Sequence, residues 1–202
     1  MHEVTVYTTD ATRDQFRKRY GIESHEKIVL FLARINKIKG LDLLLNAFCG
    51  LEKEVDDIRL VIAGPDDGYL AQLKEDITRL GITDEVLLTG PLYKKAKLEA
   101  YVDADAYVLP SSYDTFPLTV IEACACGAPT IVTNRCGIAD AIREVGYVAD
   151  YDINQLQSAM RDVVTNAALR ERMGRGGARM VRERYNIEKI IDDLERLYRE
   201  CI

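Results

Sequence analysis

The chain has 202 residues, of which 48% are hydrophobic, and a formal net charge of −6. That length and apolar content suit one large domain, and no apolar run approaches the roughly 20 residues that a transmembrane helix needs. The acidic balance argues against a nucleic-acid binder, the start lacks the features of a signal peptide, and we expect a cytoplasmic protein that could still bind a small anion.

Short apolar segments alternate with helical ones along the chain. Residues 1–26 are polar, and we expect an irregular linker with one short helix at 13–21. Because the later apolar segments are apolar almost throughout, both faces of the sheet should be buried, and their alternation with helices predicts a parallel, doubly wound α/β sheet. The predicted strands are 27–33, 58–64, 85–90, 106–111, 128–134 and 146–150, and the predicted helices are 42–51, 69–81, 96–104, 117–127 and 137–144.

The strand signal ends at residue 151. Residues 151–202 predict two or three amphipathic helices, broken near 174–177 and near Asn186. We therefore expect a Rossmann-like domain of about six strands at 27–150, with these C-terminal helices packed on it. Ligands bind such sheets at the carboxyl ends of the strands. The loops where a site should lie are 34–40, 64–68, 90–93, 110–118 and 133–138.

The cysteines and histidines fit no catalytic or metal-binding pattern. The five cysteines have no zinc-like spacing, and Cys124 and Cys126 lie in an apolar helix. Buried free thiols of a cytosolic protein are the expectation. His2 and His25 fall in polar segments near the start, which argues against a histidine dyad or a histidine metal site.

The first loop places two cations beside a helix start. Arg34 follows the first strand directly, and Lys39 stands just before Gly40 and the next helix. Free N–H groups and the helix dipole favour an anion at such a point, so the loop suits a phosphate or diphosphate. A solvated basic loop is the alternative, since Lys37 has no evident role. Neither a P-loop nor a dinucleotide-binding glycine motif is present.

The next two loops carry weaker signals. Gly64 and Gly68 permit a tight turn and a close backbone approach, with or without a ligand. The acids at 66–67 lack a third partner for a metal site. Residues 90–92, followed by Tyr93, leave backbone groups accessible next to apolar side chains, which could hold the edge and face of a nucleotide base.

Asp103 and Asp105 have the Asp-x-Asp spacing that some glycosyltransferases use to hold a metal. The pair lies at the entry to a strand, which is the wrong end of the sheet for a ligand. We therefore expect a helix end and a strand start on the protein surface.

The segment SSYDTFPLTVIEACACGAP at 111–129 carries two acids, Asp114 and Glu122. Pro117 suits the first helical position, which leaves Asp114 just outside, where the dipole alone could explain it. Glu122 is the only charged residue of a helix that is otherwise nearly apolar all round and should be buried. A buried carboxylate needs partners, and either a structural salt bridge or a pair of ligand hydroxyls would serve.

These features resemble the donor-binding domain of the retaining glycosyltransferases of family four, which have the GT-B fold. That family typically carries Gly-Arg, then Lys-Gly, then Pro-Ser followed by Glu-x7-Glu, and an Ala-x-Gly-x-Pro turn. Here Arg34 and the pair Lys39 and Gly40 are followed by PSSYDTFPLTVIEACACGAPTIVTNRCG at 110–137. The similarity extends from residue 27 to about 202.

The resemblance implies a role for each position. Arg34 and Lys39 would hold the nucleotide diphosphate and stabilise its charge as it departs. Glu122 would accept hydrogen bonds from the two ribose hydroxyls, and Asp114 would approach the donor sugar as the third catalytic group. The other donor-binding positions are Phe116, Pro117 and Leu118 at the sugar, Gly90, Pro91 and Leu92 at the base, and Gly64 and Gly137 in the walls of the cleft.

Several positions depart from the family pattern. Asp114 is one methylene shorter than the usual glutamate, and Pro117 replaces a glycine and removes an N–H that could have contacted the sugar. Thr115 replaces another glycine, and Ala33 stands where a glycine usually precedes the arginine. These changes affect sugar recognition more than the diphosphate and ribose roles.

A GT-B enzyme has two such domains with the active site between them, and this chain resembles one. We expect the C-terminal domain of a larger transferase that moves a hexosyl group from an NDP-sugar, such as UDP- or GDP-hexose, to a glycan, lipid or small molecule. The acceptor would bind through an N-terminal domain missing from this chain, any peripheral membrane association would belong to the parent, and the isolated domain should turn over little or no sugar. The resemblance implies retention of the anomeric configuration, no metal and no further cofactor.

Three alternatives remain open. A non-catalytic nucleotide-sugar-binding or regulatory module of the same fold would explain the changes at Asp114, Thr115 and Pro117. A sugar-nucleotide epimerase is disfavoured because the histidines such chemistry tends to use are missing. A purely structural interaction protein is disfavoured because polar residues gather at the strand ends.

Overall fold

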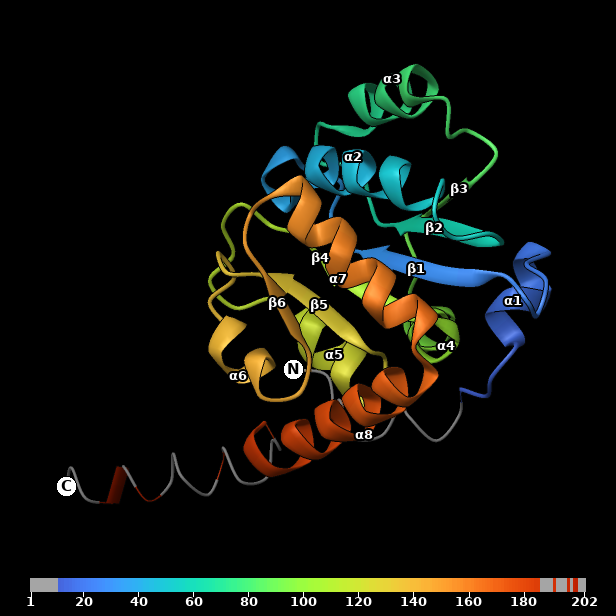
Figure 1. Ribbon diagram of the computed structural model, residues 1–202. Coiled ribbons are helices and arrows are strands. Elements are labelled where there is room, and N and C mark those ends of the chain that lie inside the picture. The colour runs from blue at the N-terminus through green and yellow to red at the C-terminus, as the bar shows by residue number, and fades with distance from the viewer. Residues whose placement is uncertain (1–10, 186–190, 192–195, 197, 200–202) are drawn as a thin grey trace.

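The computed structural model describes residues 11–185, 191, 196, 198 and 199 (Figure 1). Its strands form one parallel sheet in the order β3-β2-β1-β4-β5-β6, which confirms the predicted doubly wound, Rossmann-like α/β class. Each predicted strand is present with slightly shorter ends. The strands are β1 (Lys27–Leu32), β2 (Ile58–Ala63), β3 (Val86–Gly90), β4 (Ala106–Leu109), β5 (Thr130–Thr133) and β6 (Tyr147–Ala149).

Helices cover both faces of the sheet, as Figure 1 shows. One face carries α2 (Leu41–Leu51) and α7 (Ile153–Thr165), and the other carries α4 (Lys94–Asp103) and α5 (Leu118–Ala125). Because both faces are covered, β1 and β4 at the centre are almost wholly buried, as their continuous apolar sequence predicts. The remaining helices are α1 (Gln15–Tyr20), η1 (Lys37–Lys39, a 3-10 turn), α3 (Leu70–Leu80), α6 (Ala139–Arg143) and α8 (Ala167–Arg184).

The expected helix break near 174–177 is wrong, because α8 runs through these residues without interruption. Gly174 and Gly177 instead allow close packing: a Cβ on Gly174 would lie 2.4 Å from the carbonyl oxygen of Gly127, and one on Gly177 would lie 3.3 Å from the Cys124 side chain. The break falls at Asn166, whose side chain accepts a hydrogen bond from the Leu169 N–H and caps α8. The break expected near Asn186 lies outside the described residues.

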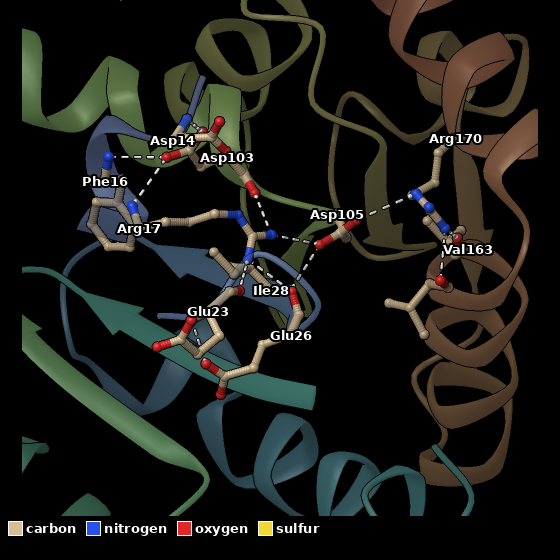
Figure 2. A network of polar contacts seen from close by, with 11 residues as sticks. Asp14, Phe16, Arg17, Glu23, Glu26, Ile28, Asp103, Asp105, Val163 and Arg170 are labelled. Carbon is tan, nitrogen blue, oxygen red and sulfur yellow. Dashed lines mark hydrogen bonds and ion pairs between the residues drawn. The ribbon is translucent and has the colours of Figure 1, made fainter. Parts of the chain in front are cut away.

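The expectation that Asp103 and Asp105 lie on the surface is also wrong. Asp103 is only 5% exposed, and its carboxylate accepts hydrogen bonds from the backbone N–H groups of Asp14, Phe16 and Arg17 at 2.6, 2.9 and 3.1 Å (Figure 2). It therefore caps the start of the predicted short helix α1 from a distant part of the chain, because the N–H groups at a helix start need acceptors. The buried ring of Phe16 adds apolar packing to the same junction.

Asp105 joins three elements in the same network (Figure 2). It accepts from the Arg17 guanidinium at 3.0 Å and from the Ile28 N–H at 2.9 Å, and it lies 3.4 Å from Nε of Arg170 on α8. The Asp-x-Asp spacing thus fastens α1, β1 and α8 to the amino edge of the sheet.

The carboxyl edge contains the topological switch point. The chain leaves β1 toward β2 and β3 on one side and continues through β4, β5 and β6 on the other. The chain therefore leaves β1 and β4 in opposite directions, and sheets of this kind bind ligands at such a point. Among the described residues, no helix combines the length and hydrophobicity that crossing a bilayer would need.

Candidate functional site

The loops after β1 and β4 are joined across the switch point. The Ser112 N–H donates to the carbonyl oxygen of Ile38 at 2.9 Å. Gly40 lies so close to Pro110 that a Cβ would come 1.9 Å from the Pro110 carbonyl oxygen. Asn36 caps the η1 turn by accepting from the Ile38 N–H. These contacts fix the turn that carries Lys39 next to the loop that carries Asp114.

Lys39 and Asp114 form an ion pair at the switch point. The distance from Lys39 Nζ to Asp114 Oδ2 is 2.6 Å, and the two side chains are 13% and 11% exposed. The sequence predicts a cation and an acid in these two loops but not that they pair with one another. Because an ammonium has three N–H donors, the pair still leaves Lys39 able to contact an anion.

Arg34 points to a different partner. Its guanidinium lies 2.6 Å from Asp67 in the loop after β2, and Asn36 Nδ2 donates to the same carboxylate at 3.1 Å. Arg34 is well exposed, so this ion pair is weak and exchangeable. The structure therefore places both predicted cations at the carboxyl edge, each already paired with an acid.

Within the described part of the chain, the Glu122 carboxylate has two partners, both on α4. Lys97 Nζ lies 2.6 Å from Oε1, and the Tyr101 hydroxyl donates to Oε2 at 3.2 Å. The side chains of Lys97 and Glu122 are 26% and 22% exposed. The salt bridge that the sequence left as one alternative is thus present, while the Glu122 side chain remains partly exposed to solvent.

Sequence reasoning missed Lys97 and Tyr101. Their four-residue spacing places them on one face of a helix, and α4 follows the loop that was expected to meet the base. A lysine and a tyrosine at that spacing, near an isolated acid of the next helix, were the available signal.

Tyr101 supports Glu122 from inside the core. Its ring packs edge-on against Tyr107, with centroids 5.5 Å apart and planes at 80°. Burial raises the pKa of the Tyr101 phenol well above its usual value, and the nearby Tyr107 and Glu122 add to the shift. The hydroxyl therefore keeps its proton and acts as a donor to the carboxylate.

The start of α5 differs from the prediction in two ways. The helix begins at Leu118, and Pro117 is its N-cap rather than its first residue. Leu118 is 65% exposed, so the helix is not buried all round as its apolar sequence suggests. Phe116 and Tyr113 are exposed as well, and Phe116 packs against Tyr185 at a centroid distance of 5.9 Å.

Three glycines shape the backbone around these side chains. A Cβ on Gly64 would lie 1.8 Å from the carbonyl oxygen of Ala33, and its N–H donates to the Gly90 carbonyl at 3.0 Å. A Cβ on Gly137 would lie 2.0 Å from the Thr115 carbonyl oxygen, and its N–H donates to the Asp114 carbonyl at 2.7 Å. Both positions require glycine because the loops touch there. Gly90 has a φ of +72°, while Pro91 is exposed and Leu92 half-buried beside it.

Asp66 has a structural task at this edge. Its Oδ1 accepts from the N–H groups of Gly68, Tyr69 and Leu70 before and at the start of α3. These hydrogen bonds, that of Leu70 first, hold the pKa of the Asp66 carboxyl below its usual value. Among the described residues, no cluster of three or more acidic, histidine or cysteine side chains is placed to hold a metal ion.

The cysteines of the described chain carry free thiols. Cys124 and Cys136 are buried, as predicted, whereas Cys49 and Cys126 are half-buried; Cys201 lies outside the described residues. Burial raises the pKa of Cys124 to about 11 and that of Cys126 to about 12. These two thiols are therefore protonated at neutral pH and unsuited to act as nucleophiles.

A cavity of about 520 Å³ lies at the opposite edge of the sheet, between α8 and the amino ends of β4 and β5. Its charged lining includes Arg170, which donates to the carbonyl oxygens of Val163 and Val164 and pairs with Asp105. This arginine is occupied in closing the end of α7, and the cavity is remote from the switch point. The candidate site therefore remains the carboxyl edge.

Comparison with known proteins gives a consistent result. Residues 12–180 match the family described as Glycosyl transferases group 1. The mannosylfructose-phosphate synthase of Agrobacterium fabrum is 34% identical over 196 residues, which cover 92% of this chain and 43% of that protein. The chain thus spans less than half the length of this relative.

Solved structures share the fold. The C-terminal domain of the group 1 glycosyl transferase LpcC from Francisella tularensis aligns with a TM-score of 0.78 at 21% identity, covering 93% of this chain and 100% of that one. The Anabaena protein HepE, solved with UDP and glucose, aligns with a TM-score of 0.86 at 16% identity, covering 98% of this chain and 55% of that one.

Proposed function

The chain belongs to the glycosyl transferases group 1 family, and on that premise we propose that it is the donor-binding, C-terminal domain of a retaining GT-B glycosyltransferase. Its ligand is a nucleoside diphosphate sugar, bound at the carboxyl edge of the sheet. The observation that carries the proposal is the pairing of Lys39 with Asp114 between the two loops that flank the switch point. This is where a doubly wound sheet binds a nucleotide, and the cation there suits a diphosphate.

We assign binding of the diphosphate to Lys39 and Arg34. Each meets one acid among the described residues, Asp114 for Lys39 and Asp67 for Arg34, so each has further N–H donors for phosphate oxygens. Charge builds up on the diphosphate as the sugar leaves, and fixed cations stabilise that charge more in the transition state than in the ground state. Leaving-group stabilisation is accordingly the catalytic contribution we assign to this domain.

Glu122 is assigned to the ribose. Its carboxylate has an acceptor position open on each oxygen beyond the contacts to Lys97 and Tyr101. Two neighbouring hydroxyls can donate to such a pair of oxygens. The remaining assignments are the backbone at Gly90, Pro91 and Leu92 for the base, the segment Phe116 to Leu118 with Asp114 for the sugar, and Gly64 and Gly137 for the cleft walls.

The acceptor is assigned to another domain of the parent protein. The chain covers less than half of a curated relative, and its fold matches about half of the HepE chain. HepE was solved with UDP and glucose, which supports a sugar nucleotide as the donor here. We propose that the parent transfers a hexosyl group to a glycan, lipid or small molecule with retention and without a metal.

Calorimetry of this chain with UDP, GDP and ADP tests the proposal. We expect weak, saturable binding of at least one of the three and little hydrolysis of the matching sugar nucleotide. If none of them produces a binding isotherm at millimolar concentrations, the site assignment is wrong.

A non-catalytic sugar-nucleotide sensor is the second candidate. The observation that favours it is that Asp114 already neutralises Lys39, while Pro117 supplies no N–H to a sugar. The two functions separate in the full-length parent, because a sensor would bind the sugar nucleotide without releasing the nucleoside diphosphate in the presence of any acceptor.

A further inference from the structure

Lys97 and Tyr101 hold the Glu122 carboxylate from two sides. They lie one turn apart on α4, with Lys97 Nζ 2.6 Å from Oε1 and the Tyr101 hydroxyl 3.2 Å from Oε2. Figure 1 shows α4 and α5 on the same face of the sheet. Each carboxylate oxygen therefore has one donor from the neighbouring helix, and the carboxylate plane is fixed by both.

The two donors differ in whether a ligand can reach them. Tyr101 is almost wholly enclosed and packs on Tyr107, so it is a rigid part of the core. Lys97 is 26% exposed, and the side chain of Glu122 beside it is 22% exposed. A ligand that covers Glu122 would therefore meet Lys97 but not Tyr101.

The Lys97 ammonium has unused hydrogen-bonding capacity. It carries three N–H donors, and Glu122 is the one acceptor that it meets among the described residues. A ribose hydroxyl is both a donor and an acceptor. Each hydroxyl can thus donate to a Glu122 oxygen while its own oxygen accepts from Lys97, which satisfies all the polar groups at the contact.

Charge gives a second reason for a lysine at this position. Covering a carboxylate removes it from water, and burying an uncompensated charge is strongly unfavourable. The ammonium at 2.6 Å offsets the charge of Glu122, so the ribose can cover the carboxylate at a lower cost. The ion pair of Arg143 and Asp140 differs, because both charged groups are exposed to water and the pairing offsets no burial cost.

We propose that Lys97 is a positioning and specificity residue for the ribose of the donor nucleotide: it orients Glu122 and donates a hydrogen bond to a ribose hydroxyl oxygen. The inference deepens the proposed function and rests on it. Lys97 would favour ribonucleotides over 2′-deoxyribonucleotides, because the combined Lys97 and Glu122 contact uses both ribose hydroxyls and a 2′-deoxyribose keeps only one of them.

The test compares Lys97→Met with the unmodified chain by calorimetry. The ligands are whichever of UDP, GDP and ADP binds tightest and its 2′-deoxy counterpart. Removing a charged hydrogen bond costs about tenfold or more in affinity, so we expect Lys97→Met to weaken ribonucleotide binding by that factor. Binding of the 2′-deoxynucleotide, which keeps only the 3′-hydroxyl for this contact, should weaken less, and the preference for ribose should fall accordingly.

Two further variants separate a specific contact from a general effect of charge. Lys97→Arg keeps a cationic donor and should restore most of the ribose preference. Lys95→Met removes the same charge two residues earlier on α4, where the side chain is 62% exposed and 3.9 Å from Glu99, and should leave the preference unchanged.

Three outcomes would contradict the inference. If Lys97→Met weakens both nucleotides equally, or does no more than Lys95→Met, Lys97 acts only through its charge or the fold. If Lys97→Met changes the affinity for neither nucleotide, Lys97 does not contact the ribose and the inference alone falls. If the unmodified chain binds none of the three nucleotides, the proposed function falls and the inference with it.

Discussion

The two edges of the sheet both carry acids paired with cations, yet they are built differently. At the amino edge, Asp103 accepts three backbone N–H groups and Asp105 accepts one N–H and contacts two arginines. At the carboxyl edge, Asp114 is held by one lysine, and Glu122 is held by one lysine and one hydroxyl. Among the described residues, the chain itself fills the acceptor positions of Asp103 and Asp105, whereas Asp114 and Glu122 keep acceptor positions open.

This difference separates structural acids from acids available to a ligand. A backbone N–H cannot leave without unfolding its segment, so a carboxylate that satisfies several of them is committed to the fold. A lysine at a rim exchanges partners at little cost. The Asp-x-Asp spacing, which looks like a metal motif, is for this reason structural, and the isolated Glu122 is the better candidate for binding.

The largest effect is expected on stability, at the amino edge. Asp103→Ala would leave the N–H groups of Asp14, Phe16 and Arg17 without their acceptor, and we expect a loss of about 3 kcal/mol in the free energy of unfolding. Urea denaturation measures it. Asp140→Ala, at a carboxylate that is almost fully exposed, is the control and should change little. A nearly unaltered midpoint for Asp103→Ala would mean that the amino edge is not the structural one.

The next largest effect is expected on nucleotide affinity at the carboxyl edge. Lys39→Ala should weaken the diphosphate contact by about 10- to 100-fold, as expected for a charged hydrogen bond, while affecting the parent nucleoside much less. Lys37→Ala in the same turn is the control, because that side chain is exposed and pairs with no acid among the described residues. Calorimetry with UDP and uridine measures both. Equal losses for the two ligands would remove the phosphate role from Lys39.

Much of the fold could be predicted because its signals are local. Apolar runs and helical periodicity are read within a few residues, and they predicted the strands, the helices up to α7 and the loops at the carboxyl edge. The wrong predictions concern contacts between distant residues. Gly174 resembles a helix break until its packing against Gly127 is known, and Asp103 resembles a surface residue until α1, 89 positions away at Asp14, folds onto it.

The same limit applies to the site. The loops of Lys39 and Asp114 could be predicted from strand ends, because all parallel strands finish at one edge. The pairing of these two side chains, 75 positions apart, could not. Lys97 was missed because its importance depends on the way α4 packs beside α5. Its four-residue spacing to Tyr101 places both residues on one face of α4 but does not show that this face meets Glu122.

A smaller effect is expected for the acid that pairs with Lys39. Asp114→Asn removes a charge that competes with the diphosphate for the ammonium and repels phosphate oxygens, so UDP should bind about threefold more tightly at low salt. Titrations at low and high salt check this, since the gain should shrink as the charges are screened. Weaker binding in the variant would show instead that Asp114 holds Lys39 in its productive position.

The smallest effect is expected for Asp66, which lies at the carboxyl edge but, like Asp103 at the amino edge, accepts several backbone N–H groups. Asp66 accepts three backbone N–H groups, and these lower its pKa in the folded state. A lowered folded-state pKa contributes stability above the unfolded value, near 3.8, and that stability is lost as the pH falls through the folded value. Asp66→Asn keeps an acceptor but no charge, so its free energy of unfolding should fall less than that of the unmodified chain on acidification. Urea midpoints measured from pH 6 down to about pH 3 follow the difference. Because the Asp66 carboxylate is satisfied by its own chain, Asp66→Asn should bind UDP as tightly as the unmodified chain at neutral pH. A large loss of affinity would mean that the number of filled acceptor positions does not separate structural acids from ligand-binding acids.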